Sequence, residues 1–168
     1  MREEVANIVL DTTVIVKSLL KPAKHLPRNV YDRELSTHKK CRTITRLLKK
    51  NRYFIYFPRA GLVEVVAVLR RNSLSRDMVS DIVSTIERTF IVVNEDLLFN
   101  KAVEVALLEA PSGFDTYFIA LAFNVKALLL TDDESMAIHA RNLNVETILV
   151  KAISEEEILK ELSGRNKS

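Results

Sequence analysis

Short apolar runs alternate with helix-like segments along almost the whole chain, and this alternation strongly constrains the fold. The runs are rich in aliphatic, β-branched or aromatic residues, as the buried strands of a parallel sheet usually are. We predict strands at Asn7–Leu10, Tyr53–Phe57, Ile91–Val93, Ala127–Leu130 and Val145–Val150. Strands joined by helices form parallel sheets with helices on both faces. The pattern therefore predicts an α/β fold, a three-layer α/β/α sandwich with a central, mainly parallel sheet.

The segments between these runs have apolar residues at helical spacing or begin with a capping residue. We predict helices at Thr13–Leu20, Thr37–Asn51, Arg59–Arg71, Ser75–Phe90, Glu95–Glu109, Phe114–Phe123, Glu134–Asn142 and Ser154–Leu162. Arg59–Arg71 could be a strand by propensity, but Pro58 suits the first turn of a helix, and we predict a helix that is buried on almost all sides. Lys21–Ser36 contains two prolines and is predicted to be a loop with room for one turn of helix.

The composition favours one soluble domain. With 168 residues, of which 48% are apolar, the chain can bury a core, and disorder is excluded. The single cysteine, Cys41, excludes a disulfide framework and a four-cysteine zinc site, and it favours a reduced compartment. No apolar run approaches the roughly 20 residues that a membrane span needs, and no signal-peptide pattern is present. We expect a cytoplasmic protein whose residues 1–168 form one domain, with an insert at about 21–40.

The net charge of +3 is unevenly distributed. Residues 1–84 contain 17 lysines and arginines against 8 acidic residues, whereas residues 85–168 contain 8 against 14. The basic excess is densest between residues 39 and 52, where it could be an ordinary solvated helix face. A nucleic-acid enzyme also needs such a surface beside an acidic pocket, because basic side chains contact phosphates. The candidate RNA-binding residues are Lys39, Lys40, Arg42, Arg46, Lys49 and Arg59.

Four acidic residues lie where a predicted strand ends or a predicted helix begins. They are Asp11, Glu64, Asp115 and Asp133. Open parallel sheets place their working groups at the carboxyl ends of strands. Carboxylates gathered there repel one another and lose solvation, and a divalent cation is the usual reason why a protein accepts that cost. The arrangement therefore points to a metal site.

Each acid also has an ordinary structural explanation. Asp11 could cap the helix that follows it, and one of Asp132 and Asp133 could cap the helix at Glu134 while the other faces the pocket. Asp115 lies three residues after Ser112, which is the spacing of a capping box. Glu64 could pair with Arg59, although it is the only polar residue between Leu62 and Leu69.

In their order along the chain, these acids and their neighbours resemble the PIN-domain family, and most closely its standalone VapC-type ribonuclease toxins. The resemblance runs from Ile8 to about Val150. The matching pieces are the strand before Asp11-Thr12-Thr13, Glu64 in the helix after the second strand, Asp115 in Ser112-Gly113-Phe114-Asp115, and Leu130-Thr131-Asp132-Asp133. By this resemblance, the metal-binding and catalytic acids are Asp11, Glu64, Asp115 and Asp133. Thr13, Thr131 and Asp132 would support them.

The resemblance implies a metal-dependent endoribonuclease that hydrolyses phosphodiester bonds of single-stranded RNA and leaves a 5′-phosphate and a 3′-hydroxyl. Carboxylate ligands fit Mg²⁺ or Mn²⁺ and do not fit zinc. The resemblance also implies a homodimer and, for a toxin, a small antitoxin protein that blocks the acidic pocket. The insert at about 21–40 lengthens the first connection and could be a lid, a dimer contact or an RNA-binding arm.

Two other functions stay open. The first is a non-catalytic PIN-like scaffold that binds RNA or protein, although the presence of all four acids argues against loss of the site. The second is a phosphatase or a receiver domain, for which Asp11-Thr12-Thr13 lacks the second aspartate two residues on. His25, His38 and His139 have no zinc-ligand spacing, and the three glycines form no phosphate-binding motif.

Overall fold

The computed structural model describes residues 6–50 and 53–165, which form a five-stranded, all-parallel sheet flanked by helices. The strands are β1 (Asn7–Leu10), β2 (Phe54–Pro58), β3 (Ile91–Val93), β4 (Leu128–Thr131) and β5 (Thr147–Leu149), in the order β3-β2-β1-β4-β5. The predicted α/β fold is confirmed, and each predicted strand is present with small shifts at its ends. The last strand is shorter than predicted at both ends: it begins at Thr147, and after Leu149 the chain turns into a 3-10 helix, η1 (Val150–Ala152).

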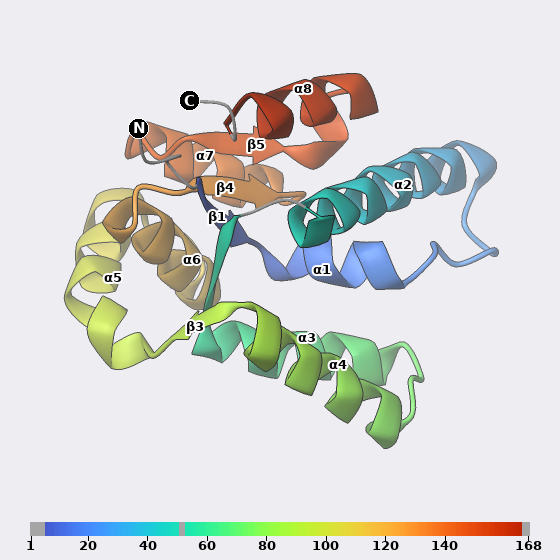
Figure 1. Ribbon diagram of the computed structural model, residues 1–168, viewed down its shortest axis with the longest axis horizontal. Helices are drawn as coiled ribbons and strands as arrows, with labels where there is room; N and C mark the ends of the chain where they lie inside the picture. Colours follow the sequence, from blue (N-terminus) through green and yellow to red (C-terminus); the bar gives the residue numbers. More distant parts are fainter. Residues whose placement is uncertain (1–5, 51–52, 166–168) are drawn as a thin grey trace.

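The helices cover both sides of this sheet (Figure 1). They are α1 (Thr12–Leu19), α2 (Arg28–Lys50), α3 (Arg59–Arg71), α4 (Arg76–Thr89), α5 (Glu95–Glu109), α6 (Gly113–Asn124), α7 (Glu134–Asn142) and α8 (Glu155–Arg165). In Figure 1, α5 and α6 lie on one side of the strands, α1 and α2 lie on the other, and α3 and α4 lie next to β3. Ser75 and Ser112 cap α4 and α6, as predicted. No helix of the described segments is long and apolar enough to cross a membrane.

The strand order creates a switch point between β1 and β4. The chain moves outward from β1 through β2 to β3, and then returns to the other side of β1 to form β4 and β5. Because crossovers between parallel strands are almost always right-handed, connections that run in opposite directions lie on opposite faces of the sheet. Ligands of open α/β sheets bind where the direction reverses, at the carboxyl ends of the strands. Asp11 follows β1, and Asp132 and Asp133 follow β4, at this position.

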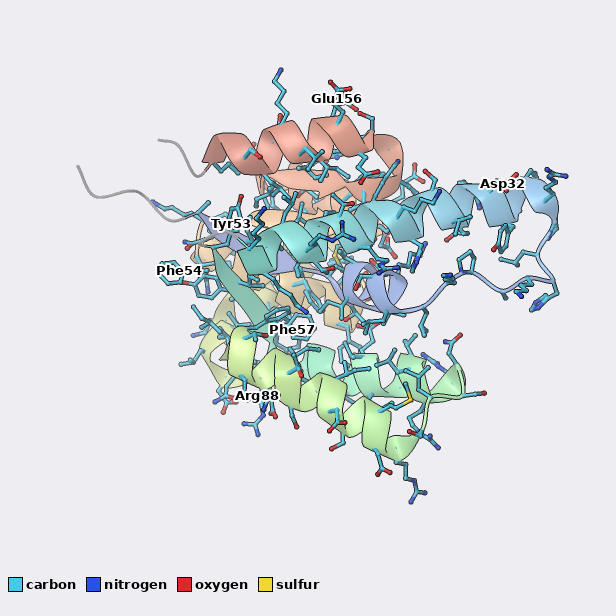
Figure 2. All side chains as sticks on the ribbon, turned by 45° about the vertical axis from the view of Figure 1, so that its right-hand side comes forward. Asp32, Tyr53, Phe54, Phe57, Arg88 and Glu156 are labelled. Atoms are coloured by element: carbon cyan, nitrogen blue, oxygen red, sulfur yellow. The ribbon has the colours of Figure 1, made fainter. Side chains whose placement is uncertain are left out.

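Helix α2 begins at Arg28, so the prediction of a loop over Lys21–Ser36 is wrong from Arg28 onward. Tertiary contacts stabilise the extra turns, since Lys17 pairs with Glu34 at 2.6 Å and the Lys17 carbonyl oxygen lies 2.6 Å from His38 Nδ1. The outer end of α2, which carries Asp32, projects away from the sheet (Figure 2). The predicted end of this helix at Asn51 lies outside the described residues.

Helix α3 lies against the core through one face only, so the prediction that it is buried on almost all sides is wrong. Val65 and Leu69 are fully buried, but Val63 is 65% exposed. Near its start, Gly61 allows a close approach, because a Cβ atom there would lie 2.7–2.8 Å from the rings of Phe57 and Phe118. These two rings pack edge to face with centroids 5.3 Å apart. The missing side chain therefore lets α3 approach α6.

Candidate functional site

Asp11 is a buried carboxylate, only 2% exposed, at the switch point of the sheet. It occupies the N-cap position of α1, but its side chain makes no capping hydrogen bond. Its Oδ2 atom instead accepts hydrogen bonds from Thr13 Oγ1 and from Thr131 Oγ1, the latter at 2.7 Å. The Oδ1 atom accepts no hydrogen bond from any described residue. The capping explanation for this carboxylate is therefore not realised, and two hydroxyl groups hold it instead.

The pKa values of Asp11 and Asp115 are both raised by their surroundings. Burial is the main reason why the pKa of Asp11 is raised to about 6, the carboxylates of Glu64 and Asp115 add to the rise, and hydrogen bonds from the two threonine hydroxyls oppose it. Burial also raises the pKa of Asp115, with Asp133 and Glu64 adding to the effect, whereas hydrogen bonding to Ser112 and the charge of His139 lower it. Repulsion between carboxylates therefore connects Asp11 with Glu64 and Asp115, and connects Asp115 with Glu64 and Asp133.

Glu64 lies half-buried on α3 and forms no ion pair within the described part of the chain. Arg59, which the sequence offered as a partner for Glu64, donates a hydrogen bond to Asn94 Oδ1 at 3.2 Å. An acidic side chain that is half-buried without a cation loses solvation without compensation. The proposed structural role of Glu64, an ion pair with Arg59, is therefore not found.

Asp132 and Asp133 have different environments although they are adjacent. Asp133 caps α7, because its Oδ1 atom accepts a hydrogen bond from Met136 N at 2.9 Å. Asp132 is buried and pairs with Lys17 Nζ at 2.6 Å, while its other oxygen accepts from Lys151 N at 3.0 Å. Asp132 N also donates to Thr13 Oγ1 at 3.1 Å. Asp132 therefore holds the loop after β4 in place. Asp133, which caps α7, is also one of the carboxylates that raise the pKa of Asp115.

The donor set fits a hard cation in its chemistry. Carboxylate oxygens are the ligands that Mg²⁺ and Mn²⁺ prefer, and repulsion within the group is the cost that such an ion would remove. Asp11, Glu64, Asp115 and Asp133 could hold it. Over residues 6–50 and 53–165, however, no three histidine, cysteine or acidic side chains are close enough together to form a ready-made metal site. Binding would therefore require some of these carboxylates to move.

The candidate RNA-binding residues do not form one surface beside the acids. Arg42, Arg46 and Lys49 line a groove of about 490 Å³ that is bounded by α1, α2 and α4. Lys40 lies against η1, where Nζ donates to Val150 O at 3.4 Å and to Lys151 O at 3.3 Å. Lys39 and Arg59 are exposed. On α2, Lys40 therefore lies beside the segment whose backbone holds Asp132, whereas Arg42, Arg46 and Lys49 line a separate groove.

The sequence analysis missed two groups near the acids. Lys17 pairs with both Asp132 and Glu34, and a signal for it exists, because Lys17 is the only charged residue in α1. His139 lies close enough to Asp115 for its charge to lower the pKa of that carboxyl group. No local pattern indicates this second neighbour, since the two residues lie on different helices, α6 and α7.

No protein-family model and no curated protein matches this sequence. Solved structures do match. PAE2754 from Pyrobaculum aerophilum aligns with a TM-score of 0.53 and 15% identity, covering 95% of this chain and 98% of that chain. FitAcB from Neisseria gonorrhoeae aligns with a TM-score of 0.51 and 17% identity, covering 87% of this chain and 99% of that chain, and FitB is a PIN-domain, VapC-like protein. The chain therefore has a PIN-like α/β fold, as its strand pattern and its ordered acids predicted.

Proposed function

We propose that this protein is a metal-dependent endoribonuclease that hydrolyses phosphodiester bonds of single-stranded RNA. The observation that carries the proposal is Asp11, a buried carboxylate at the switch point of the sheet. Its pKa is raised to about 6, in part by Glu64 and Asp115. Carboxylates that lie close together in a partly buried site without a neutralising cation are costly to the fold, and such groups are typical of functional sites. The PIN-like fold supports the same conclusion.

Asp11, Glu64, Asp115 and Asp133 would hold the Mg²⁺ or Mn²⁺ ion. When bound, such an ion polarises the phosphodiester and lowers the pKa of a coordinated water. Thr13 and Thr131 orient the carboxylate of Asp11 through its Oδ2 atom. Lys39, Lys40, Arg42, Arg46, Lys49 and Arg59 are the basic residues proposed to contact RNA phosphates.

Cleavage of a labelled, mixed-sequence single-stranded RNA tests this proposal. We expect wild-type protein to cleave with Mn²⁺ or Mg²⁺, to leave 5′-phosphate ends, and to be inactive with EDTA. Asp11→Asn and Asp115→Asn should each lower the rate roughly a hundredfold or more, because a metal ion supplies several kcal/mol of stabilisation to the transition state. Asp32→Asn, on the exposed outer part of α2, is the matched control and should stay fully active.

Failure to cleave in any metal, from folded protein free of a bound partner, would favour the non-catalytic scaffold. Binding of the same RNA without cleavage would then be its expected activity. An antitoxin partner, which the resemblance implies, stays a prediction.

We also propose that the protein forms a homodimer through α5. Apolar residues of this helix are not confined to the face that packs against the core. The helix exposes Leu97 (75%), Leu107 (81%) and Leu108 (62%), together with Phe99 and Val103. Exposed apolar patches of this kind often mark protein interfaces. A second copy of α5 is the partner proposed to cover these side chains.

Leu107→Asp should convert the dimer to a monomer, because it would bury an unpaired charge in the interface. Sedimentation or light scattering over a range of protein concentrations measures this change. Leu159→Asp, at an exposed leucine of α8, is the matched control and should leave the mass unchanged. A monomeric wild type at all concentrations would refute the dimer.

A further inference from the structure

The loop between α1 and α2, together with the first turn of α2, projects from the body of the protein as an arm. Residues 21–31 form this arm. None of them is buried, and none of their apolar side chains packs against the described core. Their hydrogen bonds are local, such as the one from Tyr31 N to Pro27 O at 2.8 Å. Figure 2 shows this end of the molecule, next to Asp32, reaching away from the sheet. The needs of the core therefore do not account for the arm.

The arm is strongly basic and has no acidic residue of its own. It contains Lys21, Lys24 and Arg28 and no aspartate or glutamate. All three basic residues are exposed. Within the described chain, Lys21 and Lys24 form no ion pair, and Arg28 pairs only with Asp32, at 3.9 Å, with both side chains largely exposed. Because an exposed ion pair of this kind is weak, the three positive charges are available to a partner.

The arm begins beside the acidic edge of the sheet. Lys17 Nζ lies 2.6 Å from Asp132 Oδ2, in the loop after β4, and 2.6 Å from Glu34 Oε2 on α2. These two contacts hold α2 against the carboxyl end of β4, where the candidate site lies. From Glu34 back to Arg28, α2 extends by only about 9 Å. A polymer that occupies the site can therefore also reach the basic end of α2.

An RNA substrate needs such a surface, because the proposed site itself is acidic. The carboxylates at the switch point repel a polyanion, and basic side chains nearby offset this repulsion. The groove of Arg42, Arg46 and Lys49 has no residue of the loop after β4 in its lining. Single-stranded RNA is bound by cations that follow its backbone and by rings on which its bases stack. The arm offers both kinds of group, since the exposed His25 and the partly exposed Tyr31 accompany its three cations.

We propose that the arm binds the backbone of the single-stranded RNA that enters the acidic site, with Lys21, Lys24 and Arg28 contacting its phosphates. This inference rests on the proposed ribonuclease function. The arm extends the substrate-binding surface beyond the bond that is cleaved, so it acts on long RNA and not on the shortest fragments. It contributes to binding and not to the chemical step. Its loss should therefore raise KM and leave kcat unchanged.

Steady-state cleavage in Mn²⁺ of two RNAs, of roughly 3 and roughly 20 nucleotides, tests this role. The variant Lys21→Gln/Lys24→Gln/Arg28→Gln should raise KM for the long RNA roughly tenfold, and leave its kcat and the cleavage of the short RNA unchanged. Because no residue of the arm is buried, this variant should fold normally.

Binding of the long RNA in EDTA gives a second measurement, by fluorescence anisotropy at several salt concentrations. The slope of log Kd against log salt concentration should fall by about 2 in the arm variant, since each of the three lost phosphate contacts contributes about 0.7. The matched control, Arg88→Gln/Lys126→Gln/Lys160→Gln, removes the same charge from exposed positions outside the arm, two of them just before β3 and β4 at the opposite edge of the sheet. It should bind and cleave both RNAs like wild type.

Two results would overturn the proposal. Equal losses in the two triple variants would show that the arm acts only through net charge. An unchanged KM and salt slope in the arm variant would show that RNA does not bind there, and would leave the arm for another partner, such as an acidic protein. Wild type that binds the long RNA without cleaving it would refute the nuclease alone, and the salt slope would then decide for or against the arm.

Discussion

Asp11→Asn is expected to stabilise the metal-free protein above pH 6, although it should strongly impair the proposed cleavage. Burial and the nearby carboxylates of Glu64 and Asp115 raise the pKa of Asp11 to about 6, so ionised Asp11 opposes folding. Asparagine cannot ionise, and its carbonyl oxygen can still accept from the hydroxyls of Thr13 and Thr131. The substitution should therefore remove a destabilising charge and keep the local hydrogen bonds.

The pH dependence follows from which state loses its proton first. Below about pH 4, Asp11 is protonated in both the folded and the unfolded chain, and it costs nothing. Between about pH 4 and pH 6 the unfolded chain loses its proton while the folded chain keeps it, so the stability of the wild type falls as the pH rises. Above about pH 6 the cost is constant. A shift of about two pKa units corresponds to at most about 3 kcal/mol.

Urea unfolding of the chelated protein at pH 4 and pH 8 measures this effect. Asp11→Asn should exceed the wild type by about 1–3 kcal/mol at pH 8, and the difference should nearly vanish at pH 4. The control Asp32→Asn, in an exposed ion pair, should change little at either pH. Adding Mn²⁺ should stabilise the wild type and leave Asp11→Asn unaffected. A variant less stable than the wild type at pH 8 would contradict the assigned charge state.

The strands and the order of the acids could be predicted from the sequence because both depend on local patterns. Short apolar runs mark β1 to β5, and the carboxyl ends of parallel strands must lie at one edge of the sheet. The early start of α2 could not be predicted this way. Its first turns are polar and follow Pro27, and they are fixed by Glu34 and His38, which contact α1. Helix propensity depends on residues close in the sequence, so it cannot predict contacts with a separate helix.

The separate roles of Asp132 and Asp133 could not be predicted from the local sequence either. Two adjacent aspartates before a helix leave open which one caps the helix and which one is paired. The decision depends on Lys17, which lies 115 residues earlier in the chain than Asp132 and reaches it across the switch point. The sequence analysis left open which of the two caps the helix, with the other free to face the pocket. Asp132, the residue that does not cap, is paired with Lys17 and accepts a hydrogen bond from the backbone of Lys151.

Lys17→Met should therefore be the most destabilising of the substitutions considered near the site. Asp132 has a side chain only 3% exposed, and Lys17 is the cation that compensates its burial. Removing one partner of a buried ion pair leaves an unpaired charge and costs about 3–5 kcal/mol. Because Lys17 itself is 31% exposed, water can replace part of the lost contact, and we expect about 2–4 kcal/mol.

Urea unfolding at pH 7 tests the role of Lys17 against two comparisons. Lys21→Met, an exposed lysine just after α1, should lose no more than about 0.5 kcal/mol. The double variant Lys17→Met/Asp132→Asn should be more stable than Lys17→Met alone, because asparagine leaves no buried charge and can still accept from Lys151 N. A double variant weaker than both single variants would show that Lys17 acts through packing and not through charge. Recovery in the double variant would establish that neutralising Asp132 is what fastens the loop after β4.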